Sequence, residues 1–96
     1  MTVKKIMDGS KATLQLEGWL DTLAASELKE AIDSLSNETE ELVMDLAGLE
    51  YISSSGLRQF VAAHKKMNGN LTLKNASVEI IDILKMTGFD KKLHVI

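Results

Sequence analysis

The chain has 96 residues, of which 45% are hydrophobic and 26% charged, a balance typical of one folded domain with a single core. It contains no cysteine, which excludes disulfide bonds, thiolate catalysis and cysteine-ligated zinc. A net charge of −3 without a basic stripe argues against nucleic-acid binding. No apolar run is long enough to span a membrane and no secretion signal follows Met1, so we expect a cytoplasmic protein that contacts no membrane.

The first part of the chain predicts a pair of strands. Residues 2–7 and 12–17 form two short runs, and in the second run leucines alternate with polar residues, as in a strand with one solvated face. Asp8-Gly9 between the runs is a hairpin signal, because glycine accepts the positive φ that such turns require. Gly18 to Thr22 is then expected to form a loop.

Residues 23–35 predict an amphipathic helix. Its apolar side chains follow the spacing i, i+4, i+7, i+8 and i+11, which places them on one face: Ala24, Leu28, Ala31, Ile32 and Leu35. Asp21 or Thr22 is expected to cap the amino end, because short polar side chains accept hydrogen bonds from free amide groups there. The polar residues 37–40 break the pattern.

The middle of the chain predicts a βαβ unit. Leu42–Leu46 is almost continuously apolar, which is typical of a parallel strand buried on both faces. A short loop and three serines follow, and then the spacing predicts a helix. Five residues fall on one face of it: Leu57, Phe60, Val61, His64 and Met67. Asn68-Gly69-Asn70 ends this helix and 71–74 forms the second strand, so that strand, helix and strand follow one another directly.

The last part predicts a third helix and an edge strand. Ser77 is expected to begin the helix, with Val78, Ile81 and Leu84 facing inward and Gly88 as the C-cap. Residues 93–96 then pack back as an edge strand. Together the elements predict a small α/β sandwich, in which one mixed β-sheet carries the helices, with a single domain over residues 1–96.

The junction Ser53-Ser54-Ser55-Gly56 is the stretch with the clearest functional content. A helix start exposes free amide groups and the positive end of the helix dipole, so a phosphate on a serine there would be tolerated by the fold. The junction also follows the carboxyl end of a central strand, where functional loops of open α/β sheets lie. The alternative is that Ser53 or Ser54 only caps the helix.

Three motifs in order carry a family resemblance. They are Gly18-Trp19-Leu20-Asp21 before a helix, Val43-Met44-Asp45-Leu46 followed by Tyr51-Ile52-Ser53-Ser54-Ser55-Gly56-Leu57-Arg58, and the ending Leu84-Lys85-Met86-Thr87-Gly88-Phe89. With this order and spacing the chain resembles the STAS domain family, specifically the bacterial anti-sigma factor antagonists. The resemblance covers essentially the whole chain.

The resemblance implies a non-enzymatic switch in transcription regulation that needs no cofactor or metal. Such proteins bind an anti-sigma factor serine kinase and so release an alternative sigma factor. The kinase phosphorylates one loop serine and abolishes the interaction, and a PP2C-type phosphatase restores it. In the family pattern Asp-Ser-Ser-Gly the second serine takes the phosphate; it corresponds to Ser55, with Ser54 as the alternative, and Ser53 stands in place of the aspartate.

The expected partner-binding surface combines the loop before the first helix with the serine junction and the exposed flank of the following helix. Both loops are expected to follow strands of one sheet, and the resemblance places them together. The residues are Trp19, Leu20, Asp21, Thr22, Ser53, Ser54, Ser55, Gly56, Arg58, Gln59 and Ala62. Trp19 fits either the core or an interface, and Asp21 is a helix cap first.

Two other functions are compatible with parts of the sequence. A serine hydrolase would use Ser54 or Ser55 with a histidine, but the pattern Gly-x-Ser-x-Gly is missing and a domain this small leaves little room for a substrate pocket. A STAS regulatory subunit of a transporter or of a stress-sensing complex would use the same surface for constitutive binding. The sequence does not distinguish a monomer from a dimer.

Overall fold

A mixed sheet of five strands forms the body of the protein in the computed structural model, which describes residues 1–96. The strands are β1 (Thr2–Asp8), β2 (Lys11–Leu20), β3 (Glu41–Ile52), β4 (Leu71–Lys74) and β5 (His94–Val95). They lie in the order in which they occur in the chain. Only β1 and β2 are antiparallel; β2, β3, β4 and β5 are parallel neighbours.

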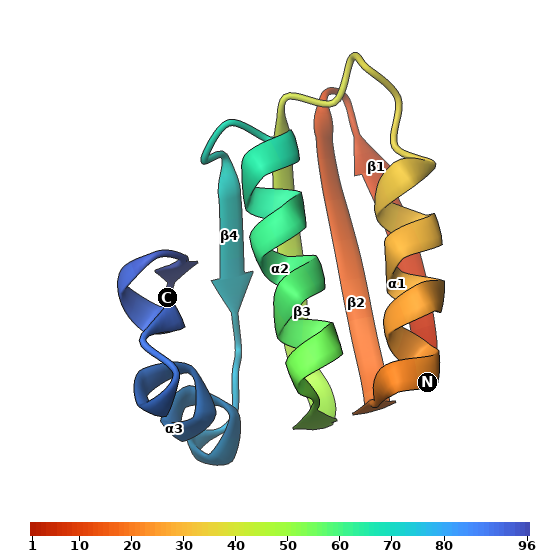
Figure 1. The fold of residues 1–96 in the computed structure, drawn as a ribbon. Coiled ribbons are helices and arrows are strands. Elements are labelled where there is room, and N and C mark those ends of the chain that lie inside the picture. The colour runs from red at the N-terminus through yellow and green to blue at the C-terminus, as the bar shows by residue number, and fades with distance from the viewer.

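Helices connect the parallel strands and cover one face of the sheet. They are α1 (Thr22–Asp33), α2 (Ser54–Lys66) and α3 (Val78–Met86), followed by a short 3-10 helix η1 (Phe89–Lys91). Figure 1 shows α1 and α2 side by side across β2 and β3, with α3 beyond β4 near the carboxyl terminus. None of the helices has the length and apolar character needed to cross a membrane.

The predicted fold is confirmed, and so are several local signals. The β1–β2 hairpin turns at Gly9, whose φ is +62°, with Asp8 paired to Lys11. Asn68 and Gly69 have positive φ after α2, and Gly88 has φ +77° after α3, so these residues end their helices as expected. The terminal edge strand forms as β5, parallel to β4.

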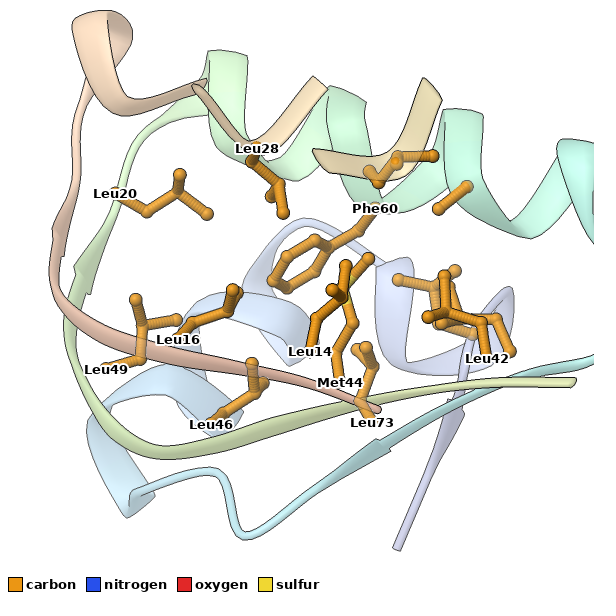
Figure 2. Packing of buried hydrophobic residues seen from close by; sticks show 14 of the residues in the cluster. Leu14, Leu16, Leu20, Leu28, Leu42, Met44, Leu46, Leu49, Phe60 and Leu73 are labelled. Atoms are coloured by element: carbon orange, nitrogen blue, oxygen red, sulfur yellow. The ribbon is translucent and has the colours of Figure 1, made fainter. Parts of the chain in front are cut away.

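The core lies between the sheet and the helix layer. Figure 2 shows the ring of Phe60, on α2, pointing toward Leu14 of β2 and Met44 of β3. All three side chains are fully buried, and Leu28 and Ile32 of α1 are buried beside them in the same cluster. The apolar stripe of α1 therefore packs as its spacing predicted.

Two strands are longer than the sequence predicted. β2 continues through Gly18, Trp19 and Leu20, which were expected in a loop, and β3 continues to Ile52 without the expected loop before the serines. The register shifts twice, between Gln15 and Glu17 and between Gly18 and Trp19, and each time β3 has one residue more than β2. With these irregularities β2 and β3 stay paired as far as Leu20 and Ile52. Gly18 adopts φ +97° at the second shift.

The burial predicted for residues 42–46 of β3 is largely confirmed. Leu42, Met44 and Leu46 alternate into the core, Val43 on the opposite side of the strand is also buried, and only Asp45 is half-buried. The helices cover one face of the sheet, so the other face stays open to solvent over much of its area (Figure 1). The exposed residues of β3 lie mainly after the predicted segment, at Ala47, Gly48, Glu50 and Tyr51.

The predicted inward face of α3 is also partly wrong. Val78 is 71% exposed and Ile81 half-buried, while Ile80 and Leu84 are fully buried. Apolar residues occupy most positions of this short helix, so its hydrophobic pattern does not define one face. The N-cap was predicted correctly: Ser77 Oγ accepts a hydrogen bond from the Ile80 amide at 3.2 Å.

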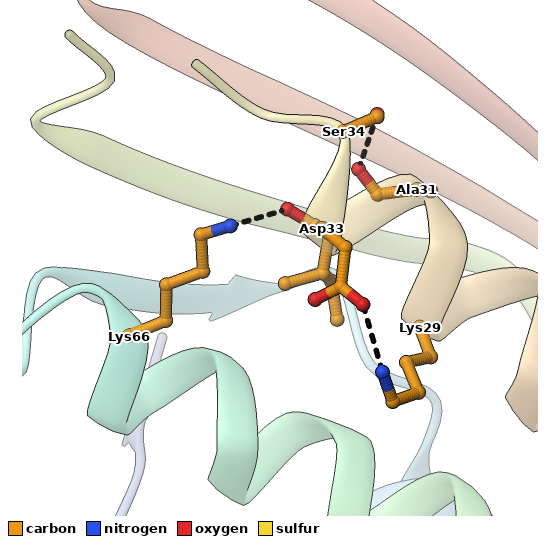
Figure 3. Close-up of polar contacts among 6 residues, drawn as sticks. Lys29, Ala31, Asp33, Ser34 and Lys66 are labelled. Carbon is orange, nitrogen blue, oxygen red and sulfur yellow. Dashed lines mark hydrogen bonds and ion pairs between the residues drawn. The ribbon is translucent and has the colours of Figure 1, made fainter. Parts of the chain in front are cut away.

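Polar contacts also join the carboxyl ends of α1 and α2. Lys66 Nζ donates a hydrogen bond to the Ile32 carbonyl oxygen at 3.0 Å, which supplies a cation to the end of α1 (Figure 3). Lys29 and Asp33 form an ion pair of 2.8 Å on the exposed side of α1, and the hydrogen bond from Lys29 lowers the pKa of Asp33. This pair is solvated and therefore contributes little to stability.

Candidate functional site

The carboxyl ends of β2 and β3 bring the two predicted loops together. Leu20 pairs with Ile52 in the parallel ladder, and the Ser53 amide donates to the Leu20 carbonyl oxygen at 2.8 Å. Each strand leads directly into a helix, α1 after β2 and α2 after β3. The amino ends of both helices therefore lie at the same edge of the sheet, as expected for parallel strands.

Side chains cap both helices in the same way. Asp21 Oδ1 accepts a hydrogen bond from the Ala24 amide at 2.8 Å at the start of α1. Ser53 Oγ accepts one from the Gly56 amide at 3.1 Å at the start of α2. Both residues have extended backbone geometry, typical of an N-cap. The cap of the serine helix is therefore Ser53, which performs this role without the charge of an aspartate.

The other two serines do not take part in capping. Ser54 and Ser55 occupy the first two positions of α2, and neither hydroxyl has a hydrogen-bond partner within the protein. Ser54 is exposed and Ser55 is half-buried. Both hydroxyls are consequently available for interactions outside the chain.

Gly56 allows the first turn of α2 to approach the strand ends closely. A Cβ atom at this position would lie 2.6 Å from Leu20 Cγ and 3.1 Å from Ile52 Cγ1, both shorter than ordinary contact distances. The glycine of the serine motif thus has a structural reason. The close approach of α2 at Gly56 also covers Leu20, which is fully buried. Leu20 and Gly56 were predicted to bind a partner, but their side-chain positions face the core.

One outward stripe of α2 contains Ser55. The residues Ser55, Arg58, Gln59 and Ala62 follow the spacing i, i+3, i+4 and i+7, which places them on one side of a helix. Arg58 and Ala62 are exposed and Gln59 is half-buried. The buried residues of the helix, including Leu57, Phe60 and Ala63, lie on the opposite side. The predicted flank of the helix is therefore accessible as one surface with Ser55.

Trp19 lies at the same end of the sheet but points elsewhere. Its side chain is 60% exposed and stacks against Tyr51 of β3, with ring centroids 5.2 Å apart and an angle of 34° between the planes. Leu20 and Ile52, the next residues, face the core, so alternation places the aromatic pair on the sheet face away from the helices. Of the two roles open to Trp19, the structure shows the exposed one. Tyr51 was not among the predicted site residues, because a short loop and not a strand was expected between Leu46 and the serines.

The remaining candidate residues have structural surroundings. Asp45 Oδ1 accepts hydrogen bonds from the Ala47 amide and from Asn75 Nδ2, both at 3.1 Å, as expected for an acidic side chain that must be satisfied within a strand. Two surface hollows of about 380 and 400 Å³ lie at the other end of the sheet, and both are lined by Glu40 and Asn70. Neither is lined by residues of the serine junction.

Residues 3–96 match the model of the STAS domain, and the chain therefore belongs to the STAS domain family. Within this family it resembles anti-sigma factor antagonists. The anti-sigma-B factor antagonist of Bacillus subtilis is 31% identical over 78 residues, which are 78% of this chain and 72% of that protein.

Solved structures show the same fold. The anti-sigma factor antagonist SpoIIAA in its unphosphorylated form has a TM-score of 0.85 at 16% identity, covering 99% of this chain and 88% of that one. The Bacillus cell fate determinant SpoIIAA in the phosphorylated form has a TM-score of 0.77 at 16% identity, covering 99% and 91%.

The tight contact at Gly56 predicts a stability effect. Gly56→Ala should lower the free energy of unfolding by about 1–3 kcal/mol despite the higher helix propensity of alanine, because the new methyl group meets Leu20 near its branch point. Urea denaturation measures this loss. Ser54→Ala, two residues earlier in the same turn and exposed, is the matched control and should change stability by less than about 0.5 kcal/mol. A Gly56→Ala protein as stable as the wild type would show that α2 begins farther from the strands.

Proposed function

We propose that this chain is an anti-sigma factor antagonist whose binding is switched by phosphorylation of Ser55. The observation that carries the proposal is the division of roles among the three serines. Ser53 caps α2, which leaves Ser55 with an unused hydroxyl at the start of an outward stripe. The similarity to an anti-sigma-B factor antagonist supports this class of function.

The proposed partner is an anti-sigma factor serine kinase. Its docking surface consists of the α2 stripe, Ser54 and the start of α1 at Asp21 and Thr22, all at one end of the sheet. Trp19 and Tyr51 extend this surface around the strand ends. Leu20 and Gly56 lie beneath this surface in the core, where they fix the position of the first turn of α2.

The proposed chemistry belongs to the partner and not to this chain. The Ser55 oxygen attacks the γ-phosphorus of ATP bound by the kinase; the new oxygen–phosphorus bond forms as the bond to the ADP oxygen breaks, and the hydroxyl proton passes to a base of the kinase. A PP2C-type phosphatase hydrolyses the phosphoserine with water and regenerates the hydroxyl. The single domain proposed for residues 1–96 thus acts as a substrate and binding module, without an enzymatic activity of its own.

The phosphate is compatible with the fold at this position. Ser55 is the second residue of α2, where backbone amides are not used by the helix and the dipole favours negative charge. The first turn of α2 contains no acidic side chain that would repel it. Phosphorylation should therefore change the surface charge of the protein while leaving its secondary structure intact.

Phosphate mapping tests the choice of serine. Wild type, Ser53→Ala, Ser54→Ala and Ser55→Ala are incubated with the cognate kinase and ATP, and the modified peptide is identified by mass spectrometry. Only Ser55→Ala should lose phosphorylation. Ser53→Ala removes the cap and should cost about 0.5–2 kcal/mol of stability, so its folding is checked by circular dichroism. Full phosphorylation of Ser55→Ala would refute the proposed site, and loss in Ser54→Ala alone would transfer it to Ser54.

Charge reversal on the stripe tests the docking surface. Arg58→Glu should weaken binding to the kinase at least tenfold, because it reverses an exposed charge one turn from Ser55, and should leave the melting temperature within about 2 °C. Binding is measured by calorimetry with unphosphorylated protein. Lys65→Glu, at the other end of the same helix, is the matched control and should retain wild-type affinity. Wild-type affinity in Arg58→Glu would remove Arg58 from the docking surface.

A further inference from the structure

Arg58 is an unusual charge for its position in α2. It is the only charged side chain in the first two turns, whereas the other basic residues of the helix, including Lys65 and Lys66, lie in the last turn. Cations near the amino end of a helix face the positive end of the dipole and are unfavourable there. The Arg58 guanidinium also has no ion-pair or hydrogen-bond partner, since the one ion pair of the protein joins Lys29 and Asp33. Neither capping nor packing explains this arginine.

We propose that Arg58 is the internal counter-ion of a phosphate on Ser55, an inference that rests on the proposed function. Ser55 and Arg58 are separated by three residues of α2, a spacing at which side chains of a helix contact one another. A guanidinium presents two parallel N–H donors to phosphate oxygens, and the resulting hydrogen bonds are charge-assisted. Arg58 is exposed, so its side chain can turn toward the phosphate without disturbing the core.

The other basic side chains of α2 lie too far along the helix to reach this phosphate. Lys65 and Lys66 lie more than two turns away on the helix, and Lys66 is already bonded to the Ile32 carbonyl. Phosphorylation would consequently have two effects on the docking surface: it adds negative charge at Ser55, and it withdraws the positive charge of Arg58 from the partner.

A double-mutant cycle tests this pairing without the kinase. Phosphoserine is placed at position 55 during translation by an expanded genetic code, in the wild-type background and in Arg58→Gln. Phosphorylation should raise the melting temperature of the wild-type background by about 3 °C, and the rise in Arg58→Gln should be less than half as large. Phosphorus NMR titration should give a lower second pKa of the phosphate in the wild-type background, because the guanidinium stabilises the dianion.

Controls distinguish pairing from a general effect of charge. Lys65→Gln removes the same charge at the far end of α2 and should keep the full rise, and Arg58→Lys should keep part of it. Equal melting shifts and equal phosphate pKa values in the wild-type and Arg58→Gln backgrounds would overturn the pairing. Because the phosphoserine is built in, a kinase that ignores Ser55 would refute the proposed function and leave this result unaffected.

Discussion

The candidate site depends on the parallel pairing of β2 and β3 up to their last residues. The hydrogen bond from Ser53 to Leu20 closes the ladder, and Gly56 lets the first turn of α2 pack on it. This contact fixes the start of the helix and therefore the position of Ser55 relative to the neighbouring loop. A side chain at residue 56 would push the helix away from the strands, and the outward stripe would move with it.

The serine motif has a structural part, Ser53 and Gly56, and a part to which we assign the proposed function, Ser54 and Ser55. Ser53 and Gly56 satisfy the helix start and its packing, which leaves the two residues between them free of structural duties. Ser53 stands where the pattern of the resembled family has an aspartate, and its hydroxyl oxygen accepts the amide hydrogen bond of the cap. The charge that an aspartate would bring is absent, and the nearest charge on the helix is the positive Arg58. The local electrostatics of this chain thus favour a phosphate at the site.

Much of the fold could be predicted because its signals are local. The α1 stripe, the caps Asp21 and Ser77 and the glycine turns depend only on residues close in sequence. The ends of β2 and β3 could not be predicted, because residues that are unfavourable in strands, such as Gly18 and Glu50, join one only when a partner strand pairs with them. The same register pairs Trp19 with Tyr51, and the burial of Leu20 follows from a contact with Gly56 that no spacing reveals.

The most direct test of the switch is the affinity of the kinase for the protein with and without phosphate on Ser55. A charge placed about 4 Å from a like charge costs around 4 kcal/mol at an effective dielectric near 20, and even half of this is a loss of about thirtyfold. Calorimetric titration should therefore show at least a thirtyfold weaker interaction for the phosphoprotein, with an unchanged circular dichroism spectrum. Equal affinities of the two forms would contradict a phosphorylation switch and leave a STAS domain that binds constitutively.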